Sequence, residues 1–119
     1  MTHCLFCETS LSISKLSCDG CKSSFEGAFS FSRLARLSIE DQKLSEALIL
    51  SGGNLKELAI SLELSYPTLK KRLLLLTENL KSLKNEDTKT IENILEDIES
   101  GNIKPEEGIK LIKEINNEL

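Results

Sequence analysis

Four cysteines lie in two Cys-x-x-Cys pairs within the first 21 residues, and the rest of the 119-residue chain has none. The pairs are Cys4 with Cys7 and Cys18 with Cys21. A segment this small cannot bury enough apolar surface to fold unaided. Each pair lets two thiolates reach one ion, and two pairs complete a closed tetrahedral site. The spacing therefore predicts one structural zinc ion per chain, holding a small β zinc ribbon over residues 1–31. We expect a short hairpin between the two cysteine pairs, followed by a strand with a bend or bulge around Gly27.

Other interpretations of these cysteines differ in how well they fit. Iron suits the same four-thiolate site, so the choice between zinc and iron stays open. Two disulfides would need an oxidising compartment, and the N-terminus lacks the basic-then-apolar order of a secretion signal. A redox pair would need a strand-helix-strand setting that the pattern does not show. His3 lies beside Cys4, but four cysteines already fill the shell, so we expect a solvated His3.

The composition excludes several classes of protein. Hydrophobic residues make up 39% of the chain, with no Trp and one Tyr, so Leu and Ile must build the core and helices are favoured. No apolar run reaches the roughly 18 residues of a membrane span, and we expect a cytoplasmic protein. Outside the cysteines there is one His and no nucleophile-base pattern or phosphate loop, so we do not expect an enzyme.

Capping residues divide residues 32–83 into three expected helices. Ser38 precedes the first helix, with an acidic residue three positions later, and a Gly-Gly pair ends it. Asn54 caps a second helix, whose apolar residues recur at helical spacing over residues 55–62. After a three-residue turn, Ser65 caps a third helix with a Pro in its first turn.

A short helix, a three-residue turn and a second helix form the helix-turn-helix pattern, in which the second helix enters the DNA major groove. The third helix presents hydroxyl and basic side chains opposite its buried leucines. Cations there can neutralise phosphates, and hydroxyls can donate to phosphates or base edges. An ordinary solvated helix face is the alternative. The residues predicted to contact double-stranded DNA are Ser65, Tyr66, Thr68, Lys70, Lys71 and Arg72.

The third helix is expected to continue past the motif as an apolar seam. Leu73, Leu76, Leu80 and Leu83 continue a heptad-type spacing. A homodimer through these four leucines would cover the seam and suit paired half-sites on DNA. Packing against the C-terminal segment of the same chain would cover it equally well, and both possibilities stay open.

The C-terminal segment, residues 84–119, is acidic, with ten Asp or Glu against five Lys. The polar stretch Lys84-Asn85-Glu86-Asp87 is expected to break the helix. An apolar stripe over residues 91–98 and a second helix opened by Pro105 then predict a short helical hairpin. Its charge repels DNA, so we expect it to serve assembly or interaction with a partner.

Three further motifs carry a family resemblance: Phe25-Glu-Gly-Ala-Phe29, Gly53-Asn-Leu-Lys-Glu-Leu-Ala59 and Leu64-Ser-Tyr-Pro-Thr-Leu69. With the cysteine pairs, they make nearly the whole chain resemble the bacterial domain-of-unknown-function-2089 family. The resemblance implies a zinc-ribbon head and a helix-turn-helix similar to the DNA-reading region of sigma factors, with no settled target. Leu5 stands where a Pro is common in that family. Glu63 stands where Gly is usual, so a left-handed backbone there would be strained by roughly 1 kcal/mol or more, or the turn differs.

The sequence thus predicts a mainly α fold in three parts. Residues 1–31 form the small N-terminal β zinc ribbon, residues 32–83 the helix-turn-helix domain with an extended recognition helix, and residues 84–119 the acidic helical hairpin. The function we expect is that of a DNA-binding transcriptional regulator. The alternative is a protein-interaction adaptor that docks RNA polymerase or another regulator without binding DNA itself.

Overall fold

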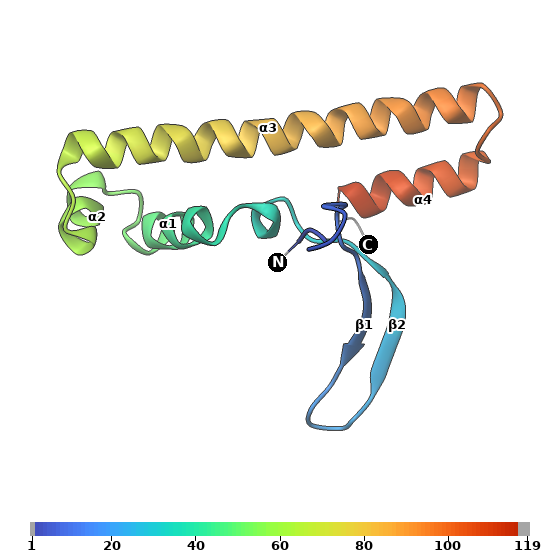
Figure 1. The fold of residues 1–119 in the computed structure, drawn as a ribbon, viewed down its shortest axis with the longest axis horizontal. Coiled ribbons are helices and arrows are strands. Elements are labelled where there is room, and N and C mark those ends of the chain that lie inside the picture. The colour runs from blue at the N-terminus through green and yellow to red at the C-terminus, as the bar shows by residue number, and fades with distance from the viewer. Residues whose placement is uncertain (1, 117–119) are drawn as a thin grey trace. The chain divides into compact units, whose positions relative to one another are not determined.

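The chain is mainly helical, with a small antiparallel sheet near its N-terminus (Figure 1). A computed structural model describes residues 2–116, and the predicted fold class is confirmed. The elements, in chain order, are β1 (Ile13–Ser17), β2 (Ser24–Phe29), the 3-10 helix η1 (Leu34–Arg36), α1 (Ile39–Leu50), α2 (Leu55–Leu62), α3 (Tyr66–Glu99) and α4 (Pro105–Ile115).

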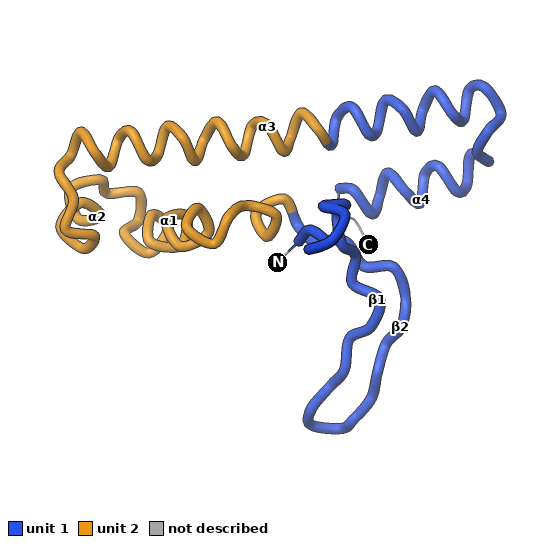
Figure 2. The backbone as a smooth tube through the Cα atoms, in the orientation of Figure 1, with its two compact units in different colours: residues 1–32, 87–119 blue, residues 33–86 orange. Residues whose placement is uncertain are grey.

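Two compact units divide the chain. Residues 33–86 form unit 2, and residues 1–32 together with residues 87–119 form unit 1. The boundary falls inside α3, where the tube changes colour in Figure 2. Unit 2 therefore contains η1, α1, α2 and the first part of α3, whereas the N-terminal sheet belongs to the same unit as α4.

The sheet of unit 1 pairs β1 with β2 and carries a bulge. Ile13 pairs with Phe29 and Lys15 with Glu26, so two steps along β1 correspond to three along β2. The extra residue lies next to Gly27, where the sequence predicts a bend or bulge. The hairpin itself differs from the prediction, which placed a hairpin between the two cysteine pairs. Only β1 runs between the pairs, and the second pair lies in the turn that joins β1 to β2.

The core of unit 2 forms where α2 meets the start of α3. Leu58 and Leu69 are completely buried and Ala59 nearly so, and leucines of α1 pack around them. The predicted caps are present: the Ser38 side chain accepts a hydrogen bond from Asp41 N at 3.1 Å. These caps satisfy amides that a helix leaves without partners at its start.

Helix α3 is one continuous helix of 34 residues, and the predicted break at Lys84-Asn85-Glu86-Asp87 is wrong. This stretch is polar but contains neither Pro nor Gly. Once a helix has formed, each further residue adds a hydrogen bond at small cost, and ordinary polar residues do not stop it. The residues of this stretch are polar, but their backbone stays helical.

The helical hairpin of unit 1 forms as predicted, from residues 87–99 of α3 and from α4. Gly101, with a φ of 80°, follows the end of α3, and Pro105 opens α4. The two helices approach closely at buried Gly108, where an added Cβ would lie 2.6 Å from Cγ1 of Ile98. Glycine at this position therefore sets the distance between the helices.

The first two leucines of the α3 seam pack within unit 2. Leu76 is 7% exposed, and Leu73 packs against the buried cluster. Leu80 and Leu83 are half-buried. The homodimer contact predicted through these four leucines therefore includes two side chains that already pack within the chain.

Candidate nucleic-acid interface and cysteine turns

The turn between α2 and α3 fixes the start of the predicted recognition helix. Glu63 adopts the left-handed conformation, with φ 54° and ψ 40°. Its neighbour Leu64 donates its N–H to the Ala59 carbonyl at 3.0 Å, which closes the end of α2. The next helix begins after Ser65, whose Oγ accepts from Thr68 N at 3.4 Å.

The hydroxyl groups of Ser65 and Thr68 form a hydrogen bond with each other at the start of α3. Ser65 Oγ and Thr68 Oγ1 lie 2.7 Å apart and share a hydrogen bond. Ser65 therefore caps α3, as the sequence predicts, in addition to its predicted place at a DNA contact. Each hydroxyl keeps further acceptor capacity, and both side chains are exposed.

The predicted DNA-contacting residues are brought together on one end of α3. All six, Ser65, Tyr66, Thr68, Lys70, Lys71 and Arg72, are exposed, whereas Leu69 in their midst is completely buried. Burial of Leu69 against α2 turns the opposite face of the helix outward. The helix-turn-helix geometry thus presents a surface with three cations and no acidic residue between positions 64 and 77.

The cations of this surface have little to neutralise them. Lys70 Nζ lies 5.3 Å from the centre of the Tyr66 ring, a cation–π contact that orients both side chains. Within residues 2–116, Lys71 and Arg72 form no ion pair. Unneutralised cations beside hydroxyl donors are what binding to phosphates requires.

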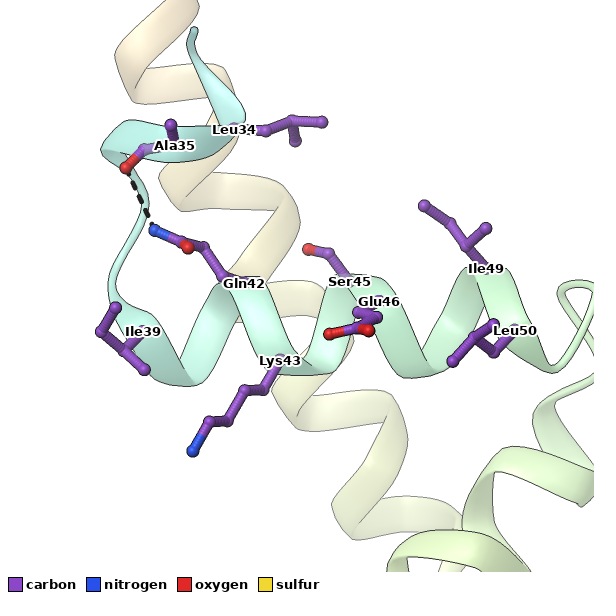
Figure 3. A pocket seen from close by; sticks show the side chains of 9 residues that line it. All are labelled: Leu34, Ala35, Ile39, Gln42, Lys43, Ser45, Glu46, Ile49 and Leu50. Carbon is purple, nitrogen blue, oxygen red and sulfur yellow. Dashed lines mark hydrogen bonds between the residues drawn. The ribbon is translucent and has the colours of Figure 1, made fainter. Parts of the chain in front are cut away.

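Helix α1 has an exposed apolar surface that was not predicted from the sequence. Ile39, Ile49 and Leu50 are 58%, 72% and 80% exposed. Figure 3 shows Ile39 at the start of α1 and Ile49 and Leu50 at its end. Between them, Gln42 Nε2 donates to the Ala35 carbonyl at 3.0 Å. The signal was present in the sequence, because α1 has apolar residues on more than one face.

The two Cys-x-x-Cys turns have the same backbone geometry. In each, the first cysteine donates its N–H to the carbonyl five residues later, at 2.9 Å for Cys4 and 2.8 Å for Cys18. The carbonyls of these cysteines accept from Glu8 N and Lys22 N at 3.0 and 2.9 Å. Both donors are left-handed, with φ 60° and 63°. The sequence therefore builds the same turn twice, with its two sulfurs in the same relative positions along the chain.

Hydroxyl groups stabilise the thiolate of the second cysteine in each turn. Cys21 Sγ lies 3.0 Å from Ser23 Oγ, and this hydrogen bond is the main cause that lowers the pKa of Cys21 to about 7. Cys7 Sγ lies 3.3 Å from Thr9 Oγ1, which lowers the pKa of Cys7 in the same way. A lowered pKa raises the thiolate fraction, and the thiolate is the form that binds metal.

The four sulfurs are not gathered around one point. Across the described residues, no group of three or more His, Cys, Asp or Glu side chains is close enough to hold an ion. All four are free cysteines, and none is in a disulfide. His3 is exposed, with its Nδ1 at 3.2 Å from Thr2 Oγ1. The single site of four cysteines therefore stays a prediction.

Over residues 2–116, no helix combines the length and the apolar character needed to cross a bilayer.

Comparison with known proteins identifies one segment. Residues 37–82 match the family model described as "Domain of unknown function (DUF2089)-HTH". The match covers α1, α2 and the start of α3, and leaves the cysteine turns outside. No curated protein and no solved structure matches the chain.

Proposed function

We propose that the chain binds double-stranded DNA as a transcriptional regulator, because residues 37–82 match the DUF2089 helix-turn-helix family model. The observation that carries the proposal is the exposed surface at the start of α3, with three cations and three hydroxyls held outward by buried Leu69. This surface lies on the second helix of the motif, which is the helix that enters the major groove in helix-turn-helix proteins.

The residues divide by the contacts they can make. Lys71 and Arg72 carry full charges and no intrachain ion pair within the described part of the chain, so they neutralise phosphates. Lys70 is held over Tyr66, which places its charge near the first turn of the helix. Thr68 and Tyr66 offer hydroxyls for phosphates or base edges. Residues 33–83 have only two more basic than acidic residues. The affinity for DNA therefore depends on the local cluster of cations at the start of α3.

Fluorescence anisotropy on labelled duplex DNA tests the proposal. The double variant Lys70→Ala with Lys71→Ala should weaken binding and reduce the slope of log affinity against log salt by about two. The matched control is Lys110→Ala with Lys113→Ala, which removes the same charge from exposed positions of α4 in unit 1. Absence of binding at low salt, or equal losses in both double variants, would contradict the proposed interface.

We also propose that Cys4, Cys7, Cys18 and Cys21 together hold one zinc ion. The matched backbone of the two turns, the free thiols and the hydroxyls that favour thiolates support this donor set. Four thiolates would leave no coordination position open, so the ion would stabilise the fold of the N-terminal segment and supply no reaction chemistry. The match to the family model gives no support here, since it begins after the cysteines.

Metal analysis of the purified protein tests the zinc proposal. We expect about one zinc per chain, released by Cys18→Ser, because three thiolates hold the ion less tightly than four. An iron-loaded site would be distinguished by its visible absorption. Ser17→Ala, an exposed neighbour of Cys18, is the control and should keep the metal. Metal-free protein with an unchanged N-terminal segment would refute the site.

A second candidate function rests on the exposed apolar surface of α1. Ile39 and Leu50 are more than half exposed and line one open pocket along α1, and exposed apolar surface is typical of protein interaction sites. The chain would then act as an adaptor that docks RNA polymerase or another regulator. A partner captured by the intact protein and lost with Ile39→Ser and Leu50→Ser, without any DNA binding, would favour this function over the first.

A further inference from the structure

A groove with an apolar floor lies between α1 and α3 in unit 2. Its volume is about 620 Å³, within the range of sites that bind ligands or peptide segments. The floor is formed by Leu34, Leu48, Ile49, Leu76 and Leu80. Two of these, Leu34 and Ile49, are 51% and 72% exposed. The groove thus leaves apolar surface in water beside the core of the unit.

The charged side chains that line the groove are all basic. They are Arg33, Lys81 and Lys84, with no Asp or Glu among the lining residues. The whole chain has 19 acidic residues against 15 basic ones, so the lining departs from the average surface of the protein. An apolar floor with a basic rim is complementary to an acidic helix that carries an apolar side chain.

Such a helix face is present further along α3. Glu92, Leu95, Glu96 and Glu99 follow the spacing i, i+3, i+4, i+7 and therefore share one face. All four are exposed, and Leu95 is 51% exposed. We call these four residues the acidic face. Its glutamates are turned away from the side of α3 on which Ile94 and Ile98 approach Gly108 of α4, with Leu95 between the two sides.

We propose that the acidic face of α3 from a second copy of this chain docks in the basic-rimmed groove. Leu95 would then enter the apolar floor beside Leu76 and Leu80, while the three glutamates meet the basic rim. The lengths agree: residues 92–99 rise about 10 Å along the helix, and residues 76–84 about 12 Å.

The occupant belongs to another molecule because of the geometry of α3 itself. Residues 76–84, which line the groove, and residues 92–99, which carry the acidic face, are parts of one unbroken helix. A continuous helix cannot fold back onto its own side, so the two surfaces of one chain cannot meet. The chain carries both halves of the contact and can satisfy them only by association.

Charge reversal followed by rescue tests this contact in the full-length protein. Sedimentation equilibrium over a concentration series should show self-association that weakens as salt rises. Lys81→Glu with Lys84→Glu should raise the dissociation constant at least about tenfold, since like charges would then face each other. Adding Glu92→Lys and Glu96→Lys to the same chain should restore association, which misfolding of the first variant could not produce.

The matched control is Lys70→Glu with Lys71→Glu, which makes the same change of charge outside the groove. It should leave self-association unchanged while abolishing any DNA binding. A failure of the self-association proposal can therefore be distinguished from a failure of the DNA-binding proposal. A chain that stays monomeric at every concentration overturns the proposal. Self-association that is insensitive to the reversal, or that is not restored by the second pair of changes, also overturns it. So does capture of a different acidic protein by a chain that does not self-associate.

Discussion

Glu63 ends α2 in a backbone conformation that favours glycine. Its φ of 54° and ψ of 40° lie in the left-handed region, which costs a residue with a Cβ about 1–2 kcal/mol. Glycine avoids this strain, but its greater freedom in the unfolded chain cancels about 0.5–1 kcal/mol of the stability that is gained. We therefore expect Glu63→Gly to raise the free energy of unfolding by about 0.5–1 kcal/mol through the backbone alone.

The charge of Glu63 adds a second contribution that must be separated. A carboxylate at the C-terminal end of a helix faces the negative end of the helix dipole, which costs about 0.3–1 kcal/mol at an exposed site. Glu63→Ala removes the charge and keeps the strained backbone. The difference in unfolding free energy between Glu63→Gly and Glu63→Ala therefore isolates the backbone strain.

Urea unfolding followed by far-ultraviolet circular dichroism measures these differences, provided that the slope m stays constant among the variants. The control is Glu78→Gly, the same substitution at an exposed position inside α3. There glycine should lower the free energy of unfolding by about 1 kcal/mol. The same substitution should thus raise the free energy of unfolding at one position and lower it at the other, because the two positions differ in φ.

Two outcomes would refute the reasoning about Glu63. One is a Glu63→Gly variant no more stable than Glu63→Ala, which would mean that the strain of the left-handed conformation does not exceed the entropic cost of glycine. The other is a loss of stability like that of Glu78→Gly, which would mean that residue 63 does not leave the helical conformation at the end of α2.

Three other substitutions test packing and capping by the same unfolding measurement. Gly108→Ala should lower stability by about 1–3 kcal/mol despite the helix propensity of alanine, because its Cβ would overlap Ile98; a gain would place the two helices further apart. Leu69→Ala should cost about 2–5 kcal/mol, whereas Leu74→Ala, at a side chain 60% exposed, should stay within about 0.5 kcal/mol; equal losses would contradict the assigned core. Asn54→Ala should cost about 1 kcal/mol, since Asn54 Oδ1 accepts from two backbone amides of the first turn of α2; unchanged stability would show that the cap contributes nothing.

The sequence predicted most of the local structure of the candidate DNA interface. Ser38, Asn54 and Ser65 were identified as helix caps, and each accepts a hydrogen bond from a backbone amide within three residues. The bulge beside Gly27 was identified in the same way. These features depend on neighbours along the chain, so the order of the residues contains the necessary information.

One prediction from the sequence was wrong and one question stayed open, for different physical reasons. The polar stretch at residues 84–87 was expected to end a helix, yet α3 runs through it, because polarity alone does not prevent helical hydrogen bonding. The sequence also left open what covers the leucine seam. Leu73 is packed by the core of unit 2, a partner that only the folded chain identifies.

The sequence by itself thus determined where helices begin, which residues face outward at the start of α3, and that two identical cysteine turns form. These depend on helical periodicity and on hydrogen bonds that span three to five residues. Only the tertiary structure decided that α1 keeps an exposed apolar surface and that three cations line one groove. The leucines and lysines of that groove come from η1, α1 and α3, and packing in three dimensions is what places residues so far apart in sequence beside one another.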